Sequence, residues 1–239
     1  MIVACHPSLS FAFKGVPEMK PLHNRPGWHS SRQGRMPSRI EGRSIRSTSS
    51  LQFDCMQWLE VDPGTWAMCE RPLRLRCRFG EAWRSHVPDL LIGREAGLEC
   101  IDLAYECNAG LPETEVRWQV IGTALTAIGI GYRVLTERHI RRQPLRGNVA
   151  TVFRARHARV TRKAAEAAAA LVGAVPALSA HELMEQSGLD ANQVWFLVRQ
   201  GLLAVDLEAA PLGPATRVSL RLDPGQRFGM GAMACRFGS

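Results

Sequence analysis

The chain has 239 residues, 46% of them hydrophobic, a formal net charge of +8 and a pI of about 9.6. This length is enough to bury a core, and the composition excludes a fibrous or wholly disordered protein. No apolar run approaches the roughly 20 residues that span a bilayer, and we find no signal-peptide pattern. The basic excess favours a polyanionic partner, of which nucleic acid is the commonest, over a membrane surface.

The cysteines indicate a reducing compartment. Their number, seven, is odd, and no two of them form a CxxC pair. Both facts argue against a disulfide framework and against a zinc ribbon. We therefore expect a cytoplasmic protein.

The first 35 residues differ in character from the rest. They carry four prolines and no hydrophobic periodicity, which is typical of a disordered extension. Met19 and Met36 are alternative start positions that one sequence does not separate. We place the first folded domain at residues 36–162.

The first half of that domain predicts a helix followed by strands. Apolar residues at helical spacing run from Leu51 to Glu60, and a Pro-Gly turn at 62–64 ends the helix. Residues 73–79 alternate between apolar side chains and arginines, which is the period of a strand with one basic face. Residues 87–92 and 101–107 predict two more short strands.

A second helix and a fourth strand complete the domain. Residues 115–128 carry apolar side chains on one helical side, and glycines end this helix. Residues 132–135 follow as a strand, and Thr136 is expected to cap a short helix. The order helix, strands, helix, strand predicts the α/β class.

The remainder predicts a smaller domain at residues 163–222 and a flexible tail at 223–239. An alanine-rich helix at 164–170 separates the two domains. Residues 179–203 fit a helix-turn-helix, with Asp190 and Gln193 spaced as a capping box. Two short strands after it, 202–206 and 216–222, would form a wing, which predicts a winged-helix-like α+β domain.

Candidate site residues lie between Pro88 and Asn108. A Pro-Asp pair, Pro88-Asp89, precedes one apolar strand, and a second apolar strand carries further acidic residues. Two carboxylates at strand ends can hold a divalent cation that activates water and neutralises a phosphate. Residues i and i+2 of a strand share a face, so an acid and a lysine at this spacing would both reach the metal.

The second strand allows two registers. One pairs Glu106 with Asn108, and the other pairs Asp102 with Ala104. We prefer the first, because a helix follows it at a suitable distance. Neither register supplies a lysine, and the chain has none between Lys20 and Lys163. Arginine is a poor replacement for a lysine that shares a proton, since its pKa stays above 12.

Together these residues resemble a known family. Residues 36–160 are similar to the TnsA-type endonuclease subunit of heteromeric bacterial transposases, a PD-(D/E)xK nuclease. The resemblance rests on the order and spacing of short motifs: Met36-Pro37-Ser38, Leu51-Gln52, Leu59-Glu60-Val61-Asp62-Pro63, Glu70-Arg71-Pro72-Leu73, Pro88-Asp89-Leu90-Leu91, Tyr105-Glu106-Cys107-Asn108, Tyr132-Arg133-Val134-Leu135-Thr136-Glu137, Ile140-Arg141 and Asn148. It implies a restriction-endonuclease-like core followed by a winged-helix-like domain.

The resemblance also implies a catalytic set that this chain keeps only in part. The aspartate falls on Asp89 and the strand acid on Glu106, and these two would hold Mg²⁺. The helix glutamate falls on Gln52 and the lysine on Asn108, so two of the four positions have lost their charge.

Three functions follow as hypotheses. The first is a TnsA-like subunit in DNA transposition that binds DNA and acts as a scaffold with impaired catalysis. The second is an active metal-dependent endonuclease that cuts at transposon ends, and the third is a winged-helix regulator. The resemblance implies DNA, together with transposase and transposition-regulator proteins of the same element, as partners near the bacterial nucleoid.

Two arginine groups are candidates for phosphate contact. Arg74, Arg76 and Arg78 share the basic face of the strand at 73–79, and Arg138, Arg141 and Arg142 form a second group. Arginine suits this task because its planar guanidinium binds phosphate oxygens in pairs.

Overall fold

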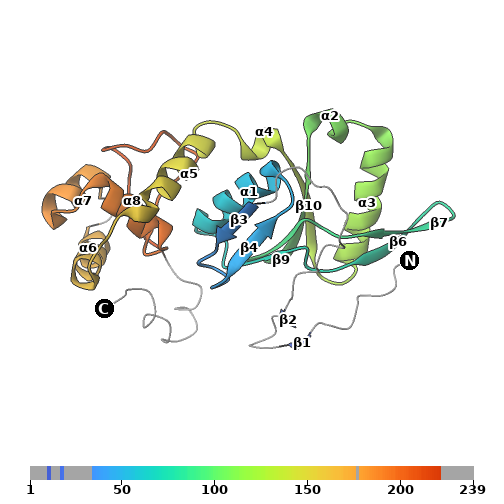
Figure 1. Cartoon of the computed structure of the whole chain (residues 1–239), viewed down its shortest axis with the longest axis horizontal. Coiled ribbons are helices and arrows are strands. Elements are labelled where there is room, and N and C mark those ends of the chain that lie inside the picture. The colour runs from blue at the N-terminus through green and yellow to red at the C-terminus, as the bar shows by residue number, and fades with distance from the viewer. Residues whose placement is uncertain (1–9, 12–16, 19–33, 176–177, 222–239) are drawn as a thin grey trace. The chain divides into compact units, whose positions relative to one another are not determined.

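The computed structural model describes residues 10–11, 17–18, 34–175 and 178–221 (Figure 1). Contacts divide the chain into two compact units. Unit 1 comprises residues 1–56 and 65–140, and unit 2 comprises residues 57–64 and 141–239. Most of the predicted N-terminal extension and all of the predicted tail at 223–239 lie outside the described residues.

The parts of the N-terminal extension that are described form strands. β1 (Ser10–Phe11) pairs with β2 (Pro17–Glu18), and β3 (Gly34–Pro37) begins just before the predicted domain start.

A mixed sheet of four strands, in the order β10–β9–β8–β5, is the centre of unit 1. β5 (Ala67–Glu70), β8 (Leu90–Arg94) and β9 (Gly97–Ala104) are antiparallel neighbours, and β10 (Gly131–Thr136) lies parallel to β9. The predicted α/β class is therefore confirmed.

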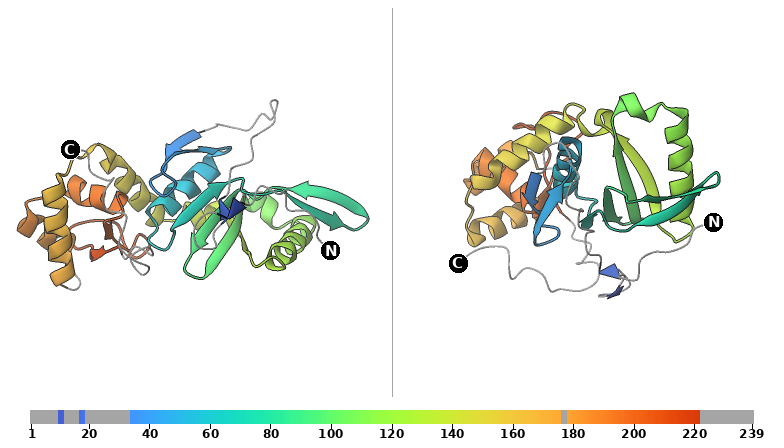
Figure 2. Two further views of the ribbon diagram at one scale, coloured as in Figure 1. Left: turned by 90° about the horizontal axis from the view of Figure 1, so that it is seen from below. Right: turned by 45° about the vertical axis from the view of Figure 1, so that its right-hand side comes forward.

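Helix α3 (Pro112–Thr126) covers one face of this sheet (Figures 1 and 2). Its buried residues pack against apolar side chains of the sheet and of β6 in one cluster: Leu73, Leu75, Cys77, Leu91, Cys100, Ile121, Ala124 and Leu125. Burial of this cluster removes apolar surface from water, which is the main driving force for folding. The buried positions all fall in the second half of α3, so its first half is left free of the core.

A two-stranded ribbon extends beside α3. β6 (Leu75–Phe79) and β7 (Ala82–His86) are antiparallel and form a sheet of their own. The turn between them needs Gly80, whose φ of 59° lies in the left-handed region. The alternation predicted for residues 73–79 is confirmed, because Leu75 and Cys77 are buried while the arginines are exposed.

Helix α1 (Ser50–Val61) precedes the sheet, as the sequence predicts. A hairpin of β3 and β4 (Ser44–Ser47) lies before it and is tied to β5 by Arg43. The guanidinium of Arg43 binds both carboxylate oxygens of the buried Glu70, at 2.8 and 2.7 Å. This bidentate pair fixes the hairpin on the sheet edge.

One predicted strand, residues 101–107, is wrong at its end. β9 stops at Ala104, and residues Glu106–Ala109 form a short helix, α2. The reason is that β10 pairs with β9 only as far as Thr136↔Ala104, after which the chain turns into α4 (Glu137–Ile140). Beyond Ala104 the strand would have no neighbour on that side.

Unit 2 contains mostly helices: α5 (Leu145–Arg154), the 3-10 turn η1 (Ala155–His157), α6 (Arg162–Ala174), α7 (Ala180–Ser187) and α8 (Ala191–Arg199). The predicted capping box of Asp190 and Gln193 is present, and Gly188 ends α7 in the left-handed conformation. β11 (Leu203–Ala204) and β12 (Ser219–Leu220) pair antiparallel in the region of the expected wing.

Helix α8 is a core helix of unit 2. Val194, Trp195, Leu197 and Val198 are buried, and Gln193 donates to the main chain of Arg159. A helix that reads DNA exposes the side chains of one face to the bases. The burial of α8 therefore leaves little surface for that role.

Removing the charge of Glu70 should destabilise unit 1. Glu70→Gln keeps the shape but leaves Arg43 without its bidentate partner, and we expect a loss of about 2 kcal/mol in the free energy of unfolding. Urea denaturation measures it. Glu99→Gln is the control, since its partner Arg133 is half exposed, and it should cost clearly less. An equal loss in the two variants would contradict this role of Glu70.

Candidate functional site

Two aspartates form the centre of the candidate site in unit 1. Asp89 stands just before β8, and Asp102 lies on β9, where the register Leu90↔Ile101 brings the two next to each other. The Asp89 N–H donates to Oδ1 of Asp102 at 3.2 Å, and the Leu103 N–H donates to Oδ2 of Asp89 at 2.9 Å. Each carboxylate is thus held by the main chain of the other strand.

The second oxygen of Asp102 is held by two side chains. Oδ2 lies 2.6 Å from Nε2 of His86 and accepts a hydrogen bond of 2.6 Å from the Tyr132 hydroxyl. Arg117 of α3 approaches the opposite nitrogen of the ring, with Nη2 3.0 Å from Nδ1 of His86. A guanidinium only donates, so Nδ1 must accept and Nε2 must carry the proton that goes to Asp102. The order Arg117, His86, Asp102 is therefore a chain of donors that ends on a buried carboxylate.

Burial sets the acidity of the first aspartate. Desolvation, with the negative charge of Asp102 as a second cause, raises the pKa of Asp89 to about 6. The Leu103 N–H acts in the opposite direction, since it binds the ionised form. The same burial, next to the charge of Asp102, raises the pKa of the Tyr132 hydroxyl, which therefore stays a donor.

Gln52 is near Asp89, as predicted, but it binds the main chain. Its Nε2 donates to the Asp89 carbonyl at 3.0 Å, and its Oε1 accepts from the N–H of Thr48 at 2.6 Å. The residue is 1% exposed. Its amide is engaged at both ends, so it links α1 to the strand without facing the carboxylates as a metal ligand.

The preferred register of Glu106 with Asn108 is wrong. Both residues lie on α2 and are exposed, and Glu106 accepts from the Thr136 hydroxyl at the end of β10. The acid that meets Asp89 is Asp102, and the position two residues further along the strand is Ala104. The lysine position of the second register is therefore occupied by a methyl group.

Sequence reasoning missed two partners of Asp102, namely His86 of β7 and Tyr132 of β10, which are far apart in the chain. A signal was present for Asp102. In an antiparallel hairpin, residues at equal distance from the turn face each other, and Asp89 and Asp102 are such a pair around residues 95–96.

The residues of the site do not suit the Mg²⁺ that the resemblance implies. Both oxygens of Asp102 already accept hydrogen bonds, and Gln52 is neutral and engaged. Within the described residues, no group of three or more His, Cys, Asp or Glu side chains is arranged to hold a metal ion. Five cysteines of the described part are free thiols.

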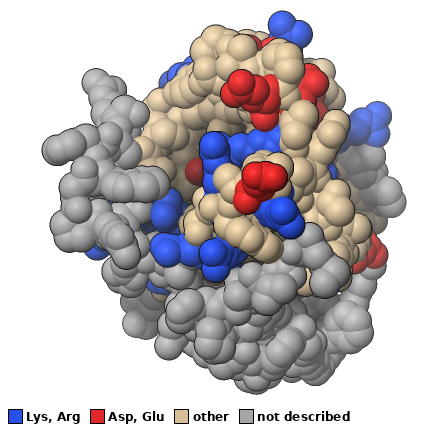
Figure 3. All heavy atoms as spheres, turned by 90° about the vertical axis from the view of Figure 1, so that its right-hand side faces the viewer, with Lys and Arg blue, Asp and Glu red and all other residues tan. Residues whose placement is uncertain are grey.

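The exposed face of the ribbon is the second candidate feature of unit 1. Arg74, Arg76 and Arg78 are exposed, and Trp83 of β7 lies directly opposite Arg78 with 44% of its surface exposed. The guanidinium of Arg76 stands 5.3 Å from the centre of the Trp83 ring. Figure 3 views the molecule from the right-hand side of Figure 1 and shows Lys and Arg side chains gathered near the middle, with acidic side chains beside them. The face offers cations beside an exposed aromatic ring.

The second arginine group is less available. Arg138 is exposed on α4, but Arg142 binds Oε2 of Glu208 at 2.7 Å and stands 5.9 Å from the ring centre of Trp58. Arg141 also takes part in contacts within the described structure. Arg142 neutralises a carboxylate of its own unit and is a weaker phosphate candidate than the ribbon arginines.

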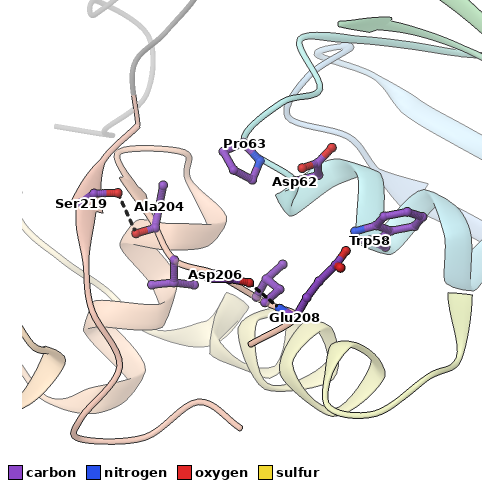
Figure 4. Close-up of a pocket in the computed structure, with 9 residues that line it drawn as sticks. Trp58, Asp62, Pro63, Ala204, Asp206, Glu208 and Ser219 are labelled. Carbon is purple, nitrogen blue, oxygen red and sulfur yellow. Dashed lines mark hydrogen bonds between the residues drawn. The ribbon is translucent and has the colours of Figure 1, made fainter. Parts of the chain in front are cut away.

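Unit 2 contains a pocket with a volume of about 360 Å³. Figure 4 shows Trp58, Asp62 and Pro63 on one side of it and residues 204–208 with Ser219 on the other. Three of its lining residues carry carboxylates, so the pocket does not suit a phosphate.

Comparisons with known proteins give no family. No protein-family model and no curated protein matches the chain. None of the described helices is both long and apolar enough to cross a membrane.

The raised pKa of Asp89 predicts a pH dependence of stability. The folded state binds the proton more tightly than the unfolded chain, so the stabilising contribution is complete below the unfolded pKa and is lost as the pH rises through about 6. The loss is on the order of 3 kcal/mol. Asp89→Asn removes the titrating carboxyl group and with it this loss. The variant should therefore gain stability relative to wild type between about pH 4.5 and about pH 7 in urea titrations. A difference that does not change with pH would contradict the assignment.

Proposed function

We propose that the chain is a TnsA-like subunit that acts in DNA transposition as a DNA-binding and scaffold component without nuclease activity. Its DNA contact is the exposed ribbon face of β6 and β7. The observation that carries the proposal is this face, where the exposed Arg76 and Arg78 flank the exposed Trp83 and the exposed Arg74 stands just before the strand.

The order of elements in unit 1 supports the choice of fold family. A helix, three antiparallel strands, a second helix and a strand parallel to the third occur in the order α1, β5, β8, β9, α3 and β10. The ribbon of β6 and β7 is inserted between β5 and β8, and the short α2 lies between β9 and α3. The Pro-Asp pair lies at the start of the middle strand, and the second acid lies opposite it. This is the arrangement that the motifs lead one to expect for a PD-(D/E)xK core.

The chemistry of the ribbon face suits a nucleic acid. Arginine binds phosphate oxygens, and an exposed indole ring can stack on a base. A two-stranded ribbon also fits the major groove of duplex DNA. The Arg78 Nε–H donates to the Gly80 carbonyl at 2.9 Å, which holds this arginine in place at the turn.

An active endonuclease is the second candidate, and the adjacent carboxylates of Asp89 and Asp102 are the observation in its favour. Against it stand the neutral Gln52, the missing lysine at Ala104 and the occupied oxygens of Asp102. Loss of one acid–base or positioning group costs about 10²–10⁴-fold in rate. The regulator hypothesis has less support, because α8 is buried.

A cleavage assay on supercoiled DNA with Mg²⁺ or Mn²⁺ tests the absence of catalysis. We expect the wild-type chain to leave the DNA intact. His86→Ala combined with Ala104→Lys frees Oδ2 of Asp102 and supplies a lysine beside the acid pair, so it should raise cleavage, whereas His86→Ala with Asn108→Lys should not, because Asn108 lies on α2. Efficient cutting by the wild type that Asp89→Ala abolishes would overturn the scaffold proposal.

DNA affinity should depend on salt through the ribbon arginines. Arg76→Ala and Arg78→Ala should each lower the log–log salt slope by about 0.9, because each removes one phosphate contact. Fluorescence anisotropy with a labelled duplex and a labelled single strand measures it. Trp83→Ala should weaken binding at every salt concentration with the slope unchanged, since stacking releases no counterions.

The control is Arg162→Ala, which removes an exposed arginine of unit 2 that pairs with Glu166. It should leave the slope unchanged. Ribbon variants that bind like the wild type would show that the DNA contact lies elsewhere.

A further inference from the structure

The acid pair of unit 1 is surrounded by donors of the protein itself. Asp102 is 5% exposed and accepts from the Asp89 main chain, from His86 and from Tyr132. These donors come from the ribbon (His86), from β10 (Tyr132) and from the main chain of Asp89, the residue before β8. A buried carboxylate is stable only when its oxygens are satisfied, and here the protein satisfies them.

The positive charge at this site is also supplied by the protein. Arg117 donates to His86, and His86 donates to Asp102, so the guanidinium is coupled to the carboxylate through a neutral imidazole. In a metal site, a divalent cation would take the place of these donors on the carboxylate oxygens. A cation and the His86 N–H cannot both occupy the same side of Oδ2.

We propose that His86, held by Arg117, occupies the place of a divalent cation at the Asp89–Asp102 pair and converts this site into a structural cross-link. The proposal rests on the hydrogen bonds of unit 1 and deepens the proposed function, because it gives a reason for the absence of metal-dependent chemistry. The His86 link joins β7, β9 and α3, and the Tyr132 hydroxyl adds β10.

The location of Arg117 explains how α3 takes part. The first half of α3 has no buried residue, so its packing contributes little there. The bond of Arg117 to His86 fastens this half to the ribbon, four residues before the buried Ile121. The cross-link thus acts where the hydrophobic core ends.

The test is a pair of measurements on the untagged full chain without DNA. A negative result therefore contradicts the cross-link alone and does not bear on the proposed DNA binding. Isothermal titration with Mn²⁺ should detect no ion bound to the wild-type acid pair. His86→Ala removes the donor and leaves two adjacent carboxylates. It should lower the melting temperature by at least about 4 °C. It should also take up one Mn²⁺ that restores part of this loss, since binding to the folded state stabilises it.

Two further variants keep the test decisive. Tyr132→Phe removes one donor and keeps the ring, so it should melt below the wild type even if His86→Ala fails to fold, and it should take up no Mn²⁺ because His86 stays on Asp102. His181→Ala removes an exposed histidine of unit 2 and should change neither property. Mn²⁺ binding by the wild type that Asp102→Asn abolishes would overturn the proposal. A folded His86→Ala variant that melts like the wild type or takes up no Mn²⁺ would also overturn it, and so would a Tyr132→Phe variant that melts like the wild type or takes up Mn²⁺.

Discussion

The carboxylate of Asp102 is the constraint on which unit 1 depends. It lies buried on β9, and the donors that satisfy it come from the ribbon, from β10 and from the chain that enters β8. An unsatisfied carboxylate in this position would cost far more than an ordinary hydrogen bond contributes. The ribbon, the sheet and the first half of α3 are therefore held in one arrangement by a single acidic side chain, reached from α3 through Arg117 and His86.

This constraint separates the two surfaces that a nuclease would use together. The acid pair is turned inward and has its hydrogen bonds within the protein, whereas the arginines of β6 and Trp83 are turned outward. His86 is the last residue of β7, so the anchored end of the ribbon and its exposed outer face belong to one element. Under the proposed function, the acid pair positions the ribbon surface that we propose for DNA contact.

Much of the fold could be predicted from local patterns. The alternation in residues 73–79 gave the buried and exposed sides of β6, and the Asp190–Gln193 spacing gave the start of α8. The site could be predicted only in part. Asp89 and Gln52 lie close together as expected, but Glu106 was preferred over Asp102 because strand parity does not say where a ladder ends. That end is set by β10, a parallel partner about thirty residues later. His86 and Tyr132, which are 16 and 30 residues from Asp102 in the chain, were not predicted as its partners, because local patterns do not show contacts at such separations.

The most direct test of the central claim, that this protein binds DNA without a divalent cation, compares affinity with and without the cation. The full chain is titrated against a labelled duplex at constant ionic strength, once with EDTA and once with Mg²⁺, and strand breaks are scored in the same samples. Our account predicts the same affinity in both and intact DNA throughout. Binding that requires Mg²⁺, or broken strands that appear only with Mg²⁺, would contradict it.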